Sequence, residues 1–175
     1  MAHEHLPDDY VFCPRCATPL VEAVLGRLPR MRCPACDFVH WRNPAVGAAV
    51  LIRDDEGRVL LVRRGPEASR PGLWSVPAGF VDYGEDVRAA AARELEEETG
   101  LIAEIGGVVH VASNFHDPGK LTVGVWFQGV VVGGELIAGD DADEVGWFAL
   151  DGLPDLAFRS HDTALREYRR ERKTR

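Results

Sequence analysis

The most informative segment of this chain reads GFVDYGEDVRAAAARELEEETGL and spans Gly79–Leu101. Its part from Glu85 to Thr99 is dense in Ala, Leu, Glu and Arg, which have high helix propensity. Gly100 suits the position just past a helix C-terminus, where left-handed backbone is common. Glu85 and Asp86 complement the positive end of the helix dipole. The segment therefore predicts a helix over residues 85–99.

Glutamates crowd the second half of this predicted helix. Glu94, Glu97 and Glu98 follow the spacing i, i+3, i+4, so their side chains share one face. Such a cluster costs stability unless cations lie among its oxygens. Hard divalent ions such as Mg²⁺ prefer oxygen ligands of this kind. The alternative is a solvated acidic face, although Arg93 is placed four residues before Glu97 and can hold that side chain.

The same segment matches the Nudix box, G-x5-E-x7-R-E-U-x-E-E-x-G-U, in which U is a bulky aliphatic residue. Every fixed residue of that pattern occurs at its required spacing, and Leu95 and Leu101 fill the aliphatic positions. The preceding Leu73–Gly79 (LWSVPAG) also looks like the usual lead-in of this family. From about Pro44 to Leu150, the chain resembles the Nudix hydrolases. The resemblance implies an α/β fold, the Nudix α/β/α sandwich with a mixed sheet.

The resemblance also implies a reaction and a set of metal ligands. Nudix hydrolases cleave a pyrophosphate bond in a nucleoside diphosphate linked to another group X, and release a nucleoside monophosphate. The family's metal ligands correspond to Glu94, Glu97 and Glu98, with help from the carbonyl of Gly79, and the metal is Mg²⁺ or Mn²⁺. The arginine that corresponds to Arg93 orients these glutamates.

A base must take a proton from the attacking water in this reaction. We expect Glu98 to accept this proton or to share in metal binding. Glu94 and Arg93 are the other catalytic residues expected on this helix. Some family members use a loop glutamate instead. The candidate here is Glu144 in the acidic loop Gly139–Glu144, and the alternative is that Glu144 is an ordinary solvent-exposed residue. Glu85 is expected to support the site from outside.

The substrate is less well defined by the sequence. NADH pyrophosphatases of this family carry a Ser-Gln-Pro-Trp-Pro-Phe-type array after the box, and Val111–Gly119 (VASNFHDPG) keeps only Ser113 and Pro118 of it. ADP-ribose, FAD or another dinucleotide is thus at least as good a candidate as NADH. Two further hypotheses remain, namely a Nudix-fold ligand sensor or regulator with little turnover and an RNA-end pyrophosphohydrolase.

All four cysteines lie near the N-terminus, as Cys13-Pro-Arg-Cys16 and Cys33-Pro-Ala-Cys36. Two C-x-x-C pairs at this separation are typical of a structural zinc site, in which four thiolates leave no place for water. Two disulfides are the alternative, which fits a chain without an export signal poorly. We predict a zinc ribbon over residues 1–43, similar to that of the NADH pyrophosphatase branch. A Nudix domain is predicted over residues 44–175, ending in a helix and a basic tail.

Charge and hydropathy restrict the partners. The chain has 175 residues and a net charge of −8, and the part from Asn43 to Leu165 has 21 acidic and nine basic residues. That part should repel a nucleic-acid backbone, so a small nucleotide substrate is expected rather than nucleic acid. Met1–Asp9 lacks the apolar core of a signal peptide, and no apolar run reaches the roughly 20 residues that span a bilayer. A cytoplasmic protein is expected, and a homodimer by family analogy alone.

Hydrophobic patterning predicts the remaining elements. Ala45–Arg53 and Arg58–Arg64 are expected to pair as a hairpin around the turn Asp54–Gly57. Further strands are predicted at Val108–Ala112, Leu121–Val132 and Val145–Leu150. A terminal helix is predicted at Ser160–Arg170.

Overall fold

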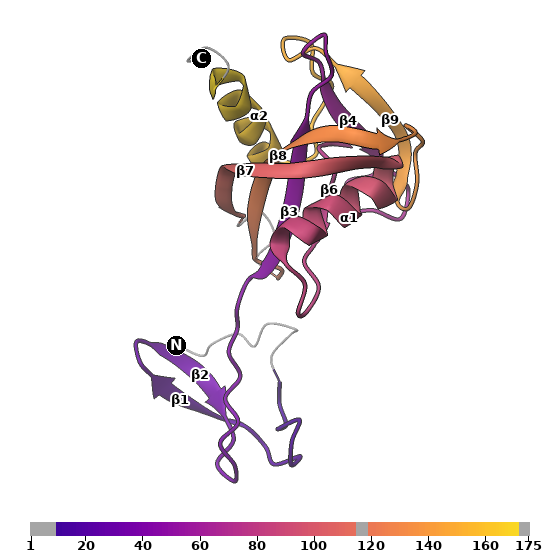
Figure 1. Cartoon of the computed structure of the whole chain (residues 1–175). Helices are drawn as coiled ribbons and strands as arrows, with labels where there is room; N and C mark the ends of the chain where they lie inside the picture. Colours follow the sequence, from indigo (N-terminus) through magenta and orange to yellow (C-terminus); the bar gives the residue numbers. More distant parts are fainter. Residues whose placement is uncertain (1–9, 115–118, 172–175) are drawn as a thin grey trace. The chain divides into compact units, whose positions relative to one another are not determined.

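The computed structural model describes residues 10–114 and 119–171 of the chain (Figure 1). The chain divides into two compact units. Among the described residues, the smaller contains residues 10–44 and 119–121, and the larger contains residues 45–114 and 122–171. The predictions made for Met1–Asp9, for Pro118 and for the end of the basic tail fall outside the described residues. Within the described ranges, no helix is both long and apolar enough to cross a membrane.

The smaller unit is built on an antiparallel hairpin of β1 (Val21–Leu25) and β2 (Leu28–Arg32). Gly26 takes the left-handed conformation that the tight turn between them requires, with φ of +70°. Over residues 10–44, the buried core of this unit consists of Cys13, Leu20 and Cys33. So little buried surface cannot stabilise a unit of this size without a further tether.

The larger unit has two sheets. The first is mixed and four-stranded, in the order β6 (Ala78–Phe80), β3 (Ala45–Ile52), β8 (Thr122–Gly134) and β7 (Leu101–Asn114), with β3 parallel to β8 and the other pairs antiparallel. The second is antiparallel, in the order β5 (Trp74–Ser75), β4 (Val59–Arg64) and β9 (Ala142–Phe148).

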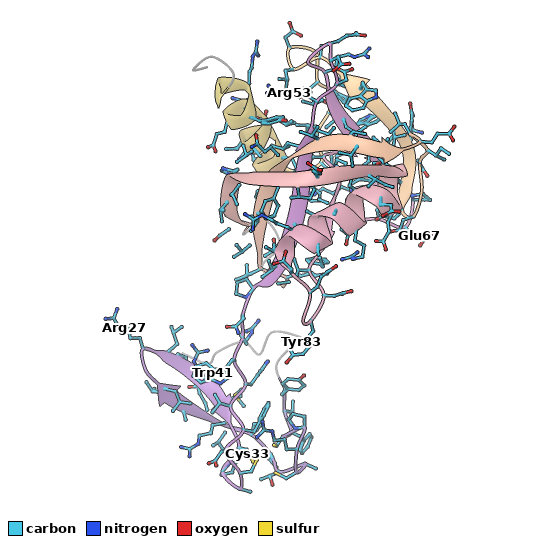
Figure 2. The ribbon with its side chains drawn as sticks, viewed as in Figure 1. Arg27, Cys33, Trp41, Arg53, Glu67 and Tyr83 are labelled. Carbon is cyan, nitrogen blue, oxygen red and sulfur yellow. The ribbon has the colours of Figure 1, made fainter. Side chains whose placement is uncertain are left out.

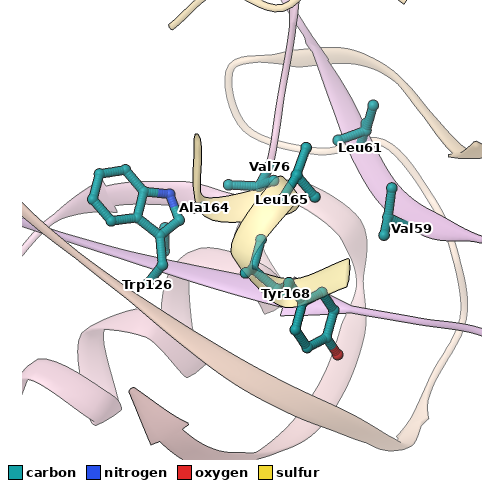
Figure 3. Packing of buried hydrophobic residues seen from close by; sticks show 9 residues of the cluster. Val59, Leu61, Val76, Trp126, Ala164, Leu165 and Tyr168 are labelled. Carbon is teal, nitrogen blue, oxygen red and sulfur yellow. The ribbon is translucent and has the colours of Figure 1, made fainter. Parts of the chain in front are cut away.

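Two helices cover opposite faces of β3 (Figure 1). Successive side chains of a strand point to opposite faces of the sheet. Leu51 therefore belongs to a hydrophobic cluster with side chains of α2 (Arg159–Glu171), and Val50 belongs to another with a side chain of α1 (Val87–Thr99). Figure 3 shows the α2 cluster, with Leu165 among strand side chains. The structure thus confirms the α/β/α sandwich with a mixed sheet.

The predicted pairing of Ala45–Arg53 with Arg58–Arg64 as a hairpin is wrong. β3 and β4 belong to different sheets, and the bridge where they approach each other joins Arg53, the residue after β3, to Val59. The physical reason is that β8 pairs with β3 along one whole side and β6 pairs with Gly47–Ala49 on the other, so little edge is left for β4.

Strand β7 is longer than the sequence indicated. It begins at Leu101 rather than near Val108, and it passes through Gly106 and Gly107. Register shifts between Ile105 and Val108 absorb the glycine pair as an irregularity in the ladder with β8. The glycine pair therefore lies inside the strand.

Candidate active site

Helix α1 is held at both ends by local contacts. Asp86 is the N-cap, and its carboxylate accepts hydrogen bonds from the backbone N–H of Arg88 at 2.9 Å and of Ala89 at 3.3 Å. At the other end Gly100 has φ of +69°, and its N–H donates to the carbonyl of Glu96 at 2.8 Å. The helix starts two residues later than predicted because Glu85 and Asp86 form its entrance.

The backbone of β6 lies directly against one carboxylate of α1. A Cβ atom at position 79 would collide with the carboxylate of Glu94, so a larger residue there would displace that carboxylate. One residue earlier, the N–H of Ala78 donates to Oε2 of Glu98 at 3.0 Å. The short strand therefore brings Gly79 to the acidic face of the helix.

Arg93 gathers three of the glutamates. Its Nε donates to Glu85 at 2.9 Å, and its Nη1 donates to Glu94 at 2.8 Å and to Glu97 at 2.9 Å. Its Nη2 also donates to the carbonyl of Phe80 at 3.0 Å. The Arg93 guanidinium holds the pKa of Glu85 down at about 2. One side chain thus orients the carboxylates, and the contact with Glu97 agrees with their spacing on the helix.

Glu98 is the most deeply buried of these acids, with 3% of its surface exposed. Burial raises its pKa to about 8, and the negative charges of Asp141 and Glu94 act in the same direction. Burial is also the main cause of a raised pKa at Glu94, to which the charges of Glu97 and Asp140 contribute. Crowded, desolvated carboxylates of this kind fit a divalent cation, which would supply the missing positive charge.

A loop after β8 brings two further acids to this cluster. The N–H of Gly139 donates to the carbonyl of Glu98 at 3.2 Å, and the N–H of Gly65 donates to the carbonyl of Asp141 at 2.7 Å. Asp140 sits in the left-handed region, with φ of +48°. Its charge acts on Glu94, and that of Asp141 acts on Glu98.

Glu144, the loop glutamate expected from the sequence, has a different partner. It lies on β9 opposite Arg63 of β4, and the two side chains form an ion pair at 3.0 Å. Sequence reasoning singled out the acidic loop but not the two acids at its start, Asp140 and Asp141. Their position next to Gly139 was the available signal, since glycine permits the close approach of this loop to α1.

The smaller unit carries a second candidate metal site. The sulfur atoms of Cys13, Cys16, Cys33 and Cys36 all lie within 4.8 Å of one another, and all four thiols are free. The Sγ of Cys13 is 3.6 Å from that of Cys36, and the Sγ of Cys16 is 3.5 Å from that of Cys33. Four converging thiols with no disulfide suit one tetrahedral zinc ion.

Comparison with known proteins agrees with this geometry. The NUDIX domain family matches residues 43–170. An ADP-ribose pyrophosphatase of Methanocaldococcus jannaschii is 40% identical over 131 residues, which cover 74% of this chain and 76% of that protein. The NAD-capped RNA hydrolase NudC of Stutzerimonas stutzeri is 33% identical over 150 residues, which cover 85% of this chain. The chain spans about half of the length of the NudC relatives, 51% in that case.

Solved structures show the same relationship. A crystal structure of a NUDIX hydrolase from Nitrosomonas europaea has a TM-score of 0.81 and 32% identity, and the match covers 94% of this chain and 93% of that one. A MutT NUDIX hydrolase from Burkholderia pseudomallei has a TM-score of 0.64 and 32% identity, over 72% of this chain and 98% of that one. With the family match across residues 43–170 and the relative that is 40% identical, these structures show that the chain belongs to the Nudix hydrolase family.

Proposed function

We propose that this Nudix hydrolase cleaves the pyrophosphate bond of ADP-ribose, or of a closely similar ADP-linked compound, and releases AMP. The observation that carries the proposal is the carboxylate cluster on and beside α1. Arg93 binds three of its members, Glu85, Glu94 and Glu97, and a fourth, Glu98, is buried against β6. ADP-ribose comes first among substrates because the relative from Methanocaldococcus jannaschii is similar over about three quarters of both chains.

Four groups would hold the divalent cation in this proposal: the carboxylates of Glu94, Glu97 and Glu98 and the carbonyl of Gly79. When bound, Mg²⁺ or Mn²⁺ would offset the negative charge of the pyrophosphate and acidify a water molecule. Arg93 keeps its neighbouring glutamates in place, and Glu85 in turn holds Arg93 from outside the helix.

Glu98 is the proposed acceptor of the water's proton. The N–H of Ala78 fixes its carboxylate, and its burial keeps bulk water from competing for the proton. Asp141 is the second candidate, because its charge reaches Glu98 from the loop. Hydrolysis of ADP-ribose at the pyrophosphate adds one water and gives AMP and ribose 5-phosphate.

A hydrolysis panel tests the proposal. Purified protein would be incubated with Mg²⁺ or Mn²⁺ and ADP-ribose, NADH, NAD⁺, FAD, diadenosine polyphosphates or nucleoside triphosphates, and AMP would be measured by chromatography. We expect ADP-ribose to have the highest kcat/KM and Glu98→Gln to abolish its turnover. An absence of turnover with every compound and both metals would favour a ligand sensor and contradict the proposal.

A second substrate is supported by the NudC relatives, which match 85% of this chain in the first case. Those proteins are named as NAD-capped RNA hydrolases, so a capped RNA is the second candidate. An RNA with a 5′ NAD cap would be compared with free NAD⁺ under the same conditions. A kcat/KM for the capped RNA above that for ADP-ribose would make RNA the preferred substrate.

A further inference from the structure

The hairpin of the smaller unit separates its charges between two faces. Arg30 lies opposite Ala23, and Arg32 lies opposite Val21. Alternate residues of a strand share a face, so both arginines point to one side of the hairpin. Glu22 belongs to the other face, and hence the strands place no carboxylate beside the two arginines.

An aromatic ring joins this face. Val39 forms a bridge with Arg32, and the N–H of His40 donates to the carbonyl of Met31 at 2.8 Å. The chain after the last cysteine therefore runs along β2 and brings Trp41 beside Arg30. The guanidinium of Arg30 lies over the indole, 4.3 Å from the ring centroid, and Trp41 remains 57% exposed.

Among the described residues, no carboxylate pairs with the cationic groups of this hairpin. Across residues 10–114 and 119–171, no ion pair links Arg27, Arg30 or Arg32 to an acid, and the buried Nε of Arg30 has no hydrogen-bond partner there. Figure 2 shows Arg27 and Trp41 toward the end of this unit that lies away from Cys33. We call Arg27, Arg30, Arg32 and Trp41 the basic platform.

We propose that the basic platform binds single-stranded nucleic acid, with a base stacked on Trp41 and the phosphates beside Arg27 and Arg32. Exposed aromatic rings among cationic side chains bind single strands in this way, largely without regard to sequence. The acidic part from Asn43 to Leu165 gave the expectation of a small nucleotide rather than nucleic acid, but the first 42 residues have no net charge. Within this neutral unit, the hairpin collects Arg30 and Arg32 on one face beside Trp41.

Binding of a fluorescein-labelled oligouridylate of about 12 nucleotides to the full-length, zinc-loaded protein would test the proposal by anisotropy. We expect Trp41→Ala to weaken binding about tenfold, because it removes the stacking surface. The double variant Arg30→Ala/Arg32→Ala should weaken binding and lower the dependence of log K on log salt by about one, measured from about 50 to about 200 mM KCl.

Two variants in the same unit serve as matched controls. Arg15→Ala removes one positive charge within the first cysteine pair, and Val24→Ala truncates a side chain that is 74% exposed on the other hairpin face. Both should bind like wild type within about twofold. Hydrolysis of ADP-ribose and zinc content should be unchanged in every variant, so the result is independent of the proposed activity.

Three results would overturn the proposal: wild-type protein that does not bind the oligonucleotide at low salt, affinity that is insensitive to Trp41→Ala, or an equal loss in Arg15→Ala. Sedimentation velocity tests the competing explanation that this face is an interface between protein chains. If Trp41→Ala dissociates an oligomer while oligonucleotide affinity stays constant, this face is an interface between protein chains and the proposal is wrong.

Discussion

Glu98 shows how far a single residue depends on its surroundings. It is one of several glutamates on α1, yet it is the one that the structure buries, and burial raises its pKa to about 8. Glu85, by contrast, has a pKa held at about 2 by Arg93. Two glutamates of one motif thus have opposite electrostatic environments, and each predicts a different response to mutation and pH.

We expect Glu98→Gln to lower kcat by about two orders of magnitude or more, because glutamine neither accepts the proton nor binds the cation as a carboxylate does. The amide keeps the volume of the side chain, so the fold should survive. The measurement is kcat on ADP-ribose, with circular dichroism as the check on folding. A wild-type rate would remove Glu98 from the site.

The raised pKa of Glu98 also predicts a pH dependence of stability. In protein freed of Mg²⁺ and Mn²⁺ but still holding zinc, the folded state binds a proton at Glu98 that the unfolded state has lost. The free energy of unfolding should therefore fall as pH rises from the ordinary value of 4.5 to about 8. Urea unfolding across this range measures the effect. It should be smaller in Glu98→Gln, and an equal slope in the two proteins would contradict the assignment.

The acidic loop gives a comparison between neighbouring acids. Asp141→Asn should lower kcat by about tenfold or more, because its charge acts directly on Glu98. Glu144→Gln should stay within about threefold of wild type, since the Glu144 carboxylate is paired with Arg63. Steady-state kinetics of the two variants, measured side by side, decides whether Asp141 or Glu144 is the loop carboxylate of the site. The reverse order would restore Glu144 as the loop carboxylate of the site.

At the scale of elements, the site depends on how closely β6 approaches α1. We expect Gly79→Ala to lower the free energy of unfolding by about 1–3 kcal/mol and to weaken Mg²⁺ binding, because the new Cβ would displace the Glu94 carboxylate. Gly133→Ala is the matched control, since a Cβ there meets nothing within 4 Å. Urea unfolding and a Mg²⁺ titration of activity measure both effects. Equal behaviour of the two variants would show that the close approach is unimportant.

At the scale of the whole molecule, the two units differ in what stabilises them. The larger unit has buried clusters on both faces of β3, whereas the smaller one buries little beyond its cysteines. We expect Cys33→Ser to lose zinc and to expose the smaller unit to proteolysis. Elemental analysis gives the zinc content and limited proteolysis gives the local stability. Zinc content equal to that of wild type would refute a four-cysteine site.

The sequence by itself determined the parts of this protein whose contacts are local. It predicted α1, the shared face of Glu94 and Glu97 and the two cysteine pairs, because helix periodicity and short spacings are fixed by covalent geometry. Asp86 and Gly100 are further examples, since capping requires only neighbouring backbone groups.

Only the tertiary structure decided which distant segments meet. It separated β3 from β4, brought Asp141 to Glu98 and placed Trp41 over Arg30. None of these contacts is set by spacing along the chain, because each depends on which strand or loop occupies the space next to another. Burial, and with it the pKa of Glu98, follows from that packing and not from the identity of the residue.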